Sequence, residues 1–588
     1  MPFNEKNKKN AVLRLVILLL CSAMFLSACR TKEEESGIEV IDLTAPTPSS
    51  EFPIPDAPIK QTATASPTLL PVTQSSSSAN QAGLIIFSMA DGAFKHLFAY
   101  HPSYLPVTRI TADAWDDESP SISPNGDRIA YTSNRFGQRD VFILDLVNNT
   151  LTQMTNSPAY EGKIDWSNDG NYIVYDVYQD DRHDLIIQSV TDTQEPPIQL
   201  TDGESNYFQP AWSPDGKQIA FVTDQSGRNE IWLARLQDPN ERFLKLIGDP
   251  LADYENPAWS PDGSWLAVSR QENKQEVLLI SSENSAQEPL VIGYGKNPVW
   301  LPDGSGVLVT IESANDTDIL AYAVPNKHMM LPPIKLEGGL SGYDWNSANL
   351  VPNLQKWTAQ HPVSSPEVLW KTDDEVSAGE NGRRSLITLE GIEAPNPALS
   401  DSADDRFYAL RDLVEEKSGW DFLGILENAT LPATSKDMPS ITENWLFTGR
   451  AIGVNLAPYE AGWMVVSKEE FAGELYWRVW IKCKVQDGTC GQPISGTIWD
   501  FNSRFSGDIV AYENGGRVLP ANAGYWVDFT ELASRCGWER IPSQNNWRSY
   551  FPGIQFNVFV FRQNLSWTQA LLEIYPPDQV AIILGSDQ

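Results

Sequence analysis

Carboxylates are the side chains best placed for acid–base chemistry toward the end of this chain. All five histidines lie at or before residue 361 of 588, so the last 227 residues contain no imidazole. Two carboxyl groups can act as general acid and general base without histidine, as they do in glycosidases. The candidates are Asp500, Asp508, Glu513, Asp528, Glu531 and Glu539. Their spacing does not distinguish them from surface acids, so a carboxylate-based hydrolase is the alternative and a non-catalytic protein is favoured.

Cys29 follows a segment that is typical of bacterial export signals. A lysine-rich start precedes an apolar run over residues 11–25, which is too short to stay as a membrane span. The run ends in Leu26-Ser27-Ala28-Cys29, which resembles the bacterial lipobox, where the cysteine is lipidated and becomes the mature N-terminus. This resemblance implies a signal peptide over residues 1–28 and a lipoprotein anchored to the bacterial membrane, facing outside the cytoplasm. The alternative is an ordinary secretory signal with a chance cysteine.

The remaining cysteines permit a disulfide. Cys483 and Cys490 flank Gln-Asp-Gly-Thr, a predicted hairpin turn, so the two can pair across a short loop in an oxidising compartment. They can equally stay reduced, and Cys536 has no obvious partner. The spacing fits no zinc pattern and no histidine is nearby. We therefore expect no metal site and no cofactor.

Residues 29–83 have the composition of a tether. They lack hydrophobic periodicity and are rich in Pro, Ser and Thr. Such a segment cannot offset the entropy of ordering by burying apolar surface, and its prolines keep it extended. We expect a disordered tether that holds the folded part away from the bilayer.

The overall charge excludes one class of partner. The chain has 77 acidic and 43 basic residues and a formal charge of −34. Phosphate binding needs clustered lysine and arginine. Nucleic acid is therefore not expected as a partner.

A repeated unit dominates the first part of the folded chain. PAWSPDGKQIAFVT at 210–223 returns as PAWSPDGSWLAVSR at 257–270, and each unit has apolar strands around an Asx-Gly turn. Asn-Gly and Asp-Gly supply the positive φ that a tight hairpin needs. The turn glycines are Gly126, Gly170, Gly216, Gly263 and Gly304, spaced by 44, 46, 47 and 41 residues. Four short strands in such a period are typical of a WD40-like propeller blade.

The ends of the repeat region complete each other. Residues 343–346 repeat an opening strand and then the pattern stops, whereas residues 84–102 resemble the later strands of a blade. Pairing them closes the ring and removes exposed strand edges. This predicts six blades over residues 84–348. The S-P-D-G and I-A-F pattern resembles the propeller repeats of TolB, which implies the fold and leaves function open.

Tyrosines and acids precede the inner strand of several blades. Tyrosine offers a rigid amphipathic surface that is common in binding patches, although these side chains can also simply pack the loops. We predict that they form a face for an envelope protein partner. The residues are Asp117, Glu118, Tyr160, Glu161, Tyr207, Tyr254, Glu255 and Tyr294.

Propellers also occur in prolyl-oligopeptidase-type enzymes, ahead of an α/β-hydrolase domain. That interpretation fails for this chain. The sequence has no G-x-S-x-G nucleophile motif, and the C-terminal domain at residues 381–588 has no histidine that could serve as the base.

A second domain follows the repeats. Residues 349–380 have the mixed composition of a connector, and residues 381–588 show an α+β pattern that includes a predicted helix over 404–417. The expected fold is therefore mainly β, a six-bladed propeller with a C-terminal α+β domain after a disordered tether.

Part of the C-terminal domain resembles zinc D-alanyl-D-alanine carboxypeptidases of the hedgehog-like fold. Their first metal motif runs S-x-H-x-x-G-x-A-x-D, and residues 444–453 lie in the same frame. Gly449 and Ala451 match, but Leu446 holds the His position and Gly453 the Asp position. Neither residue can bind Zn²⁺, so the resemblance implies a degenerate peptidase-like domain, a pseudoenzyme.

Together these patterns predict a lipid-anchored, non-catalytic cell-envelope protein. Its propeller would bind an envelope protein, and its C-terminal domain could contact peptidoglycan or another glycan. The alternative is a cell-wall hydrolase that uses paired carboxylates.

The anchor is directly testable. Cys29→Ser should move the mature protein from the detergent phase to the aqueous phase in phase partitioning, because it removes the acyl acceptor. Retention of the processed variant in the detergent phase would show that Cys29 is not the anchor.

Overall fold

The computed structural model describes residues 83–584 with several gaps. Cys29, the predicted signal peptide and residues 29–82 of the predicted tether lie outside the described residues. The gaps are 102–104, 193, 202, 239, 273, 283–286, 325–326, 337–339, 347–350, 361–368, 370–381 and 433–442.

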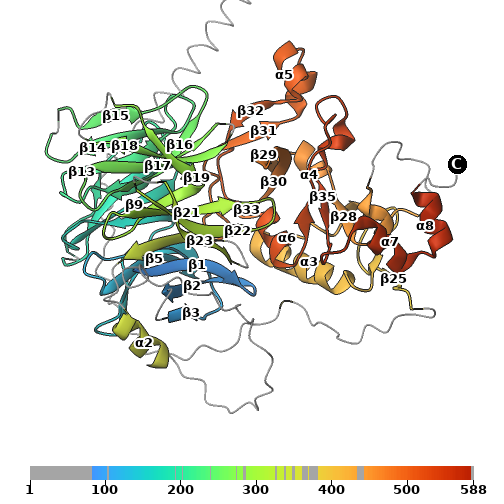
Figure 1. Ribbon diagram of the computed structural model, residues 1–588, viewed down its shortest axis with the longest axis horizontal. Helices are drawn as coiled ribbons and strands as arrows, with labels where there is room; N and C mark the ends of the chain where they lie inside the picture. The colour runs from blue at the N-terminus through green and yellow to red at the C-terminus, as the bar shows by residue number, and fades with distance from the viewer. Residues whose placement is uncertain are drawn as a thin grey trace, which may run out of the picture. The chain divides into compact units, whose positions relative to one another are not determined.

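Six four-stranded antiparallel sheets form a propeller, drawn in blue to yellow-green in Figure 1. We name them blades A to F in ring order and give the inner strand first. Blade A has β24 (Leu340–Asn346), β1 (Leu84–Asp91), β2 (Phe94–His101) and β3 (Leu105–Arg109); blade B has β4 (Asp117–Ile122), β5 (Arg128–Phe136), β6 (Gln138–Asp145) and β7 (Thr150–Gln153); blade C has β8 (Tyr160–Trp166), β9 (Tyr172–Gln179), β10 (Arg182–Ser189) and β11 (Ile198–Gln199). Blade D has β12 (Tyr207–Trp212), β13 (Gln218–Thr223), β14 (Glu230–Arg235) and β15 (Phe243–Ile247); blade E has β16 (Asp253–Trp259), β17 (Trp265–Gln271), β18 (Gln275–Ser281) and β19 (Leu290–Tyr294); blade F has β20 (Lys296–Trp300), β21 (Gly306–Glu312), β22 (Thr317–Ala323) and β23 (Met329–Leu336).

The ring closes through the split blade, as predicted. β24 pairs antiparallel with β1, with Leu84 opposite Asn346 and Phe87 opposite Tyr343. Each inner strand also contacts the inner strand of the next blade all the way round. Closure leaves blade A without an unpaired strand edge on either side of β1.

The Ser-Pro-Asp-Gly turns are built by their own side chains. The Asp215 carboxylate accepts hydrogen bonds from the Ser213 hydroxyl at 2.7 Å and from the Lys217 N–H at 3.0 Å. Gly216 follows with a φ of 73°, which a residue with Cβ rarely adopts. The same arrangement returns in blade E around Asp262, so a local sequence pattern fixes every such hairpin.

Polar bonds join neighbouring inner strands. The Asp165 carboxylate accepts from the Trp212 N–H at 2.6 Å, and Asp344 accepts from the Ile122 N–H at 2.7 Å. Three inner-strand tryptophans also donate an indole N–H to the preceding blade: Trp166 to the Ser121 carbonyl, Trp259 to that of Ala211 and Trp300 to that of Ala258. The repeated tryptophans therefore hold blades together rather than face a ligand.

The start of the predicted connector is a helix that packs on the propeller. α2 (Val351–Gln360) buries Leu354 and Trp357 against blades A and B. The Trp357 indole N–H lies 3.3 Å from the Ile110 carbonyl oxygen. Its apolar contacts extend the propeller unit past residue 348.

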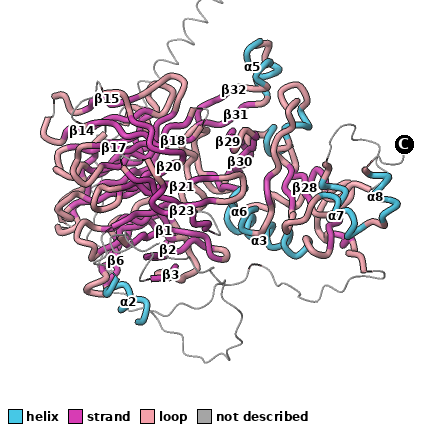
Figure 2. Tube along the Cα trace, in the orientation of Figure 1, coloured by secondary structure: helices cyan, strands magenta, loops and turns pink. Residues whose placement is uncertain are grey.

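The C-terminal α+β domain has four small sheets and several short helices, shown in Figure 2. The strands are β25 (Leu386–Thr388), β26 (Ala398–Ser400), β27 (Leu426–Asn428), β28 (Ala451–Val454), β29 (Met464–Phe471), β30 (Glu474–Lys482), β31 (Thr497–Asp500), β32 (Arg517–Pro520), β33 (Trp526–Asp528), β34 (Glu539–Arg540) and β35 (Val558–Val560). The helices are α3 (Asp404–Ser418), α4 (Ala457–Glu460), α5 (Ile509–Asn514), α6 (Phe529–Arg535), α7 (Trp567–Ile574) and α8 (Pro577–Ile583), with 3₁₀ turns η2 (Trp445–Thr448), η3 (Asn502–Phe505) and η4 (Phe551–Ile554).

Helix α3 confirms the predicted helix within one residue. It buries Phe407, Leu410 and Leu413 in the domain core, and Gly419 ends it with a φ of 79°. Tryptophans dominate that core: Trp477, Trp526 and Trp538 are fully buried. No helix within the described ranges is both long and apolar enough to span a bilayer.

Candidate functional site

The C-terminal domain contacts the propeller on the face where the inner strands begin. Among the described residues, the hydrogen bonds, ion pairs and ring contacts between them come from blades F, A, B and C. Blades A and F contribute hairpin turns, and blades B and C contribute the segments around the start of their inner strands. Blades D and E form the remaining sector of that face.

A buried cluster of opposite charges forms the first contact. The Lys95 ammonium on blade A lies 2.8 Å from Glu118 of blade B and 3.0 Å from Glu531 of α6. Glu118 also pairs with Arg139, and Glu531 pairs with Arg535 at 2.6 Å. Buried charges are stable only when paired, so each domain completes the pairing of the other.

The pKa values within this cluster show how strongly its charges interact. Burial disfavours the Glu531 carboxylate, but Lys95 and Arg535 outweigh that effect and lower the pKa of Glu531 to about 2. Burial likewise opposes the Lys95 ammonium, whereas Glu118 and Glu531 raise the pKa of Lys95 above its usual range. Both groups are therefore ionised at neutral pH.

Two further bonds extend the cluster. Lys417 of α3 lies 3.2 Å from the Asp116 carboxylate, which also accepts from the Lys95 backbone N–H at 2.8 Å. Arg535 donates to the Ala93 carbonyl at 3.3 Å. The turn between β1 and β2 is thus held by both charged and backbone contacts.

A second charged contact involves blade F. Arg478 pairs with Glu469 and Asp528, each at 2.6 Å, and approaches Glu312 of the propeller at 4.0 Å. Arg540 donates to the carbonyl of Ala314 at 2.9 Å. The turn between β21 and β22 therefore accepts a hydrogen bond from Arg540, and Arg540 forms its ion pair with Glu469 of the C-terminal domain.

An aromatic contact completes the interface at blade C. The Tyr525 ring lies 6.4 Å from that of Tyr160 and packs edge-on to Tyr178 at 5.4 Å, measured between ring centroids. The Gly524 N–H donates to the Tyr178 hydroxyl at 2.7 Å. These rings bury apolar surface between the two domains.

A cavity of about 320 Å³ lies within this interface. Lys95, Asp116 and Arg139 line it from the propeller, and Lys417, Glu531 and Arg535 line it from the C-terminal domain. Both acids among these six residues already have a lysine partner from the other domain. Over the whole lining five cations face five acids, because Arg135 adds to the four cations and Glu118, Glu416 and Asp528 add to the two acids, so the walls carry no excess of one sign.

Four residues of the predicted propeller face have structural partners. Glu118 and Tyr160 lie in the domain interface. Asp117 is buried and pairs with Arg135 at 3.1 Å, while the Glu161 carboxylate accepts from a serine hydroxyl at 2.8 Å. Burial raises the pKa of Glu161 well above its usual value.

The other four lie on blades D and E. Tyr207 packs edge-on to Phe221, Tyr254 is buried, and Glu255 accepts from the Asn229 side chain at 2.6 Å. Tyr294 is 54% exposed, with the Lys274 ammonium 5.5 Å from its ring centroid. Their role in partner binding stays a prediction, and Tyr294 is the member whose ring is largely open to solvent.

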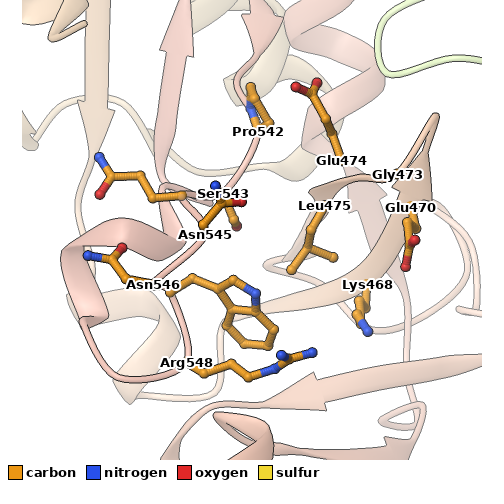
Figure 3. Close-up of a pocket in the computed structure, with 12 residues that line it drawn as sticks. Lys468, Glu470, Gly473, Glu474, Leu475, Pro542, Ser543, Asn545, Asn546 and Arg548 are labelled. Carbon is orange, nitrogen blue, oxygen red and sulfur yellow. The ribbon is translucent and has the colours of Figure 1, made fainter. Parts of the chain in front are cut away.

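A second pocket, of about 710 Å³, lies within the C-terminal domain. Figure 3 shows Lys468 and Glu470 on one side of it and Asn545, Asn546 and Arg548 on the other. The lining is polar and rich in amides. Trp547 also borders the pocket, but it is only 6% exposed and packs in the core, so its ring offers no stacking face.

The peptidase-like motif positions hold apolar structure. Leu446 is buried in η2 within a small apolar cluster. Gly449 ends η2 with a φ of 64°, and Ala451 opens β28. Gly453 lies in β28 and pairs with β27 and β35. Among the described residues, no three His, Cys, Asp or Glu side chains gather as a metal site.

The candidate catalytic acids are dispersed. Asp508 and Asp528 cap the N-termini of α5 and α6, and Glu531 belongs to the interface cluster. Asp500 accepts from a backbone N–H two residues on, Glu539 lies 3.5 Å from Arg562, and Glu513 is exposed on α5. The structure therefore brings together Asp528 and Glu531 alone, on one helical turn where arginines pair with both.

The cysteine pair left open by the sequence is joined. Cys483 and Cys490 form a disulfide with Cα atoms 6.0 Å apart, and Cys536 is a buried free thiol. The disulfide loop lies against the propeller, with Gly488 close to the Pro158 carbonyl. A constrained loop at this position helps to shape the domain interface.

No sequence pattern marks the interface residues on the C-terminal side. Lys417, Arg478, Arg535 and Arg540 are scattered over more than 120 residues, and each resembles an ordinary surface cation in the sequence. Only their contacts with propeller carboxylates and carbonyls distinguish them, and these contacts depend on the docking itself.

Comparison with known proteins confirms a TolB-like propeller. The family model described as TolB beta propeller domain matches residues 192–330. An uncharacterized protein of Agrobacterium fabrum is 32% identical over 20% of this chain and 39% of its own length, and a protein TolB homolog of Chlorobaculum tepidum is 31% identical over 23% and 31%. The Tol-Pal system protein TolB of Francisella tularensis is 25% identical over 25% of this chain and 34% of its own. The chain thus spans about a third of the length of each of these relatives.

Solved structures are similar to part of this chain. TolB from Acinetobacter baumannii is 16% identical, covers 45% of this chain and 67% of its own, and has a TM-score of 0.40. An oligogalacturonate lyase in complex with manganese is 15% identical over 43% and 74%, with a TM-score of 0.35.

Two ionisable groups predict opposite pH effects on stability. Burial raises the pKa of Asp165 to about 7 from 3.8, so this group stabilises the fold as pH falls from about 7 toward 4. The lowered pKa of Glu531 gives stability above pH 4.5 that is lost as pH falls toward 2.

We expect the melting temperature to rise on mild acidification and to fall on further acidification. Asp165→Asn should flatten the first change and Glu531→Gln the second; unchanged profiles in both variants would contradict the assignment.

Proposed function

We propose that this chain is a lipid-anchored, non-catalytic protein of the bacterial cell envelope that binds an envelope protein through its propeller. The lipobox-like Cys29 motif supports export and anchoring. The TolB-like propeller supports an envelope protein-interaction role related to the Tol-Pal system, which the name of the Francisella tularensis relative mentions. The alternative is a wall hydrolase that uses paired carboxylates.

The uncovered sector of the propeller face carries this proposal. The described contacts of the C-terminal domain with the propeller are made to blades F, A, B and C. The sector formed by blades D and E is left uncovered beside them. Tyr294 presents an exposed ring there, with Lys274 close to it. An exposed tyrosine in a polar rim is the kind of residue that anchors protein interfaces.

The charges of this sector favour a protein over a simple ion. Arg228 of blade D pairs with Asp253 of blade E at 2.7 Å, and Arg270 pairs with Glu276 within blade E, so positive and negative groups alternate across the sector. A mixed surface with an exposed aromatic ring selects a partner by shape and by matched polar groups. We therefore assign the sector to a folded envelope protein.

The C-terminal pocket supports a second contact, to cell-wall glycan. Its amides and charged groups can hydrogen-bond sugar hydroxyls and peptide groups without a stacked aromatic ring. Asn545 and Arg548 are exposed at its edge. We propose that this pocket is the part of the protein that touches peptidoglycan.

The non-catalytic assignment rests on the two motifs that could have supplied chemistry. Leu446 and Gly453 stand at the ligand positions of the peptidase-like motif, and leucine and glycine side chains cannot ligate zinc. Burial raises the pKa of Asp528, but its carboxylate is held by Arg478 and by the N-terminus of α6. Lys95 and Arg535 lower the pKa of Glu531 to about 2, so Glu531 stays ionised at neutral pH. A general acid needs the opposite environment.

Photo-crosslinking from the uncovered sector tests the proposed function. A benzophenone side chain at residue 294 should crosslink the full chain in its own cells to one discrete envelope protein. The same group at Ile198, an exposed position at the rim of blade C, should not. Tyr294→Ala should weaken capture of that protein about fivefold or more, as loss of an interface anchor does. Equal products from both positions, or none, would contradict the proposal.

A further inference from the structure

The C-terminal domain carries an apolar projection that none of its described contacts explains. We call residues 502–518 the finger; it comprises η3, α5 and the start of β32. Figure 1 shows α5 beyond the ends of β31 and β32. Five large apolar side chains on it are exposed: Phe505 at 76%, Ile509 at 72%, Val510 at 63%, Tyr512 at 67% and Val518 at 41%.

The base of the finger is firmly held, so its exposed tip is not a frayed loop. Phe501 is fully buried in the domain core, and the Arg504 guanidinium donates to the Trp547 and Arg548 carbonyls. Asp508 caps α5 by accepting from the Val510 N–H at 2.9 Å. Helix α5 rests on Ala511, which is buried. The structure therefore presents these apolar side chains in a fixed arrangement.

Exposed apolar side chains that cluster in this way mark interaction surfaces. Scattered exposed hydrophobic residues are ordinary, but here five fall within fourteen positions of one projection. The charged residues of the finger are Arg504, which is buried at its base, and Asp508, Glu513 and Arg517, so the finger has no exposed basic patch. Its chemistry suits an apolar medium and not an anionic surface.

We infer that the finger inserts into the interfacial region of the lipid bilayer. A convex tip cannot enclose a ligand, but it can place apolar side chains among acyl chains while its polar neighbours stay in water. The choice of the bilayer rests in one respect on the proposed function, because a lipid on Cys29 would keep the finger near the membrane. About fifty residues separate Cys29 from β1, and a chain of that length spans on the order of 40 Å.

Tethering makes a weak second contact effective. The lipid anchor raises the local concentration of the finger at the bilayer, so a contact that is marginal in solution becomes occupied. The contact then orients the C-terminal domain on the membrane surface. Because the contact between the finger and the bilayer is weak without the lipid anchor, the Cys29→Ser protein is still expected to leave the detergent phase.

Vesicle flotation tests the inference without the anchor. The mature chain from residue 29, carrying Cys29→Ser and therefore unacylated, would be floated with vesicles of phosphatidylcholine or of phosphatidylethanolamine with phosphatidylglycerol. We expect weak binding to both, not reduced by added salt, because the contact is apolar. Phe505→Ser with Ile509→Ser should lower the partition coefficient about tenfold or more.

A matched control has two other exposed apolar residues replaced. Leu251 and Ile582 are 69% and 62% exposed and lie on blade D's connection and on α8. Leu251→Ser with Ile582→Ser should leave flotation unchanged. An environment-sensitive fluorophore at residue 510 should shift to the blue on binding, which reports insertion even where the yield of a variant is low.

Three results would overturn the inference. The first is that the unacylated Cys29→Ser chain does not float with vesicles. The second is that the finger variant and the control variant float equally well. The third is that residue 509 crosslinks to a protein in cells although the chain does not bind vesicles. None of these affects the Cys29 anchor, which fails only if the acylated chain is absent from the detergent phase. The two claims can therefore fail separately.

Discussion

The need to pair charges that are buried between the propeller and the C-terminal domain governs this structure. Lys95, Glu118 and Arg139 lie on the propeller at low exposure, and Glu531 and Arg535 meet them from α6. Separating the domains would hydrate these groups but would also expose the Tyr160 and Tyr525 rings. Ionic pairing sets the register of the contact, and aromatic burial adds apolar stabilisation.

This docking decides which surfaces are left for other molecules. It occupies the propeller face at blades F, A, B and C, so a partner that approaches the same face meets blades D and E together with the edge of the C-terminal domain. The polar pocket beside Asn545 and the apolar finger around Ile509 lie on the C-terminal domain itself. Three chemically different surfaces are thus held in one fixed relation, which suits a protein that links membrane, wall and a protein partner, as proposed.

The propeller could be predicted from the sequence because its determinants are local. The Ser-Pro-Asp-Gly hairpins are closed by their own aspartate, as Asp215 and Asp262 show, and the five repeats together with the split blade imply the blade count. The split blade was also predictable, since an unpaired strand at each end has one energetically sensible partner. Helix α3 followed from the spacing of its apolar residues.

The site was only partly predictable. The tyrosines before the inner strands were identified by type, but Tyr160 faces the C-terminal domain and Tyr254 is buried, because tyrosine suits a core as well as an interface. The finger was missed because Phe505 and Ile509 have the same appearance in sequence as core residues. Core residues differ from exposed and interface residues in how deeply they are buried. That burial depends on how the two domains pack, and neither the repeats nor the hydrophobic periodicity of the sequence predicts it.

A double-mutant cycle between Lys95 and Glu531 tests the central claim, that the two domains are joined through paired buried charges. The free energy of unfolding would be measured for the parent, Lys95→Met, Glu531→Gln and the double variant. We expect the double variant to lose less stability than the sum of the two single losses, by about 1 kcal/mol or more. Additivity within about 0.5 kcal/mol would show that the two residues do not interact and that the domains are not docked in this way.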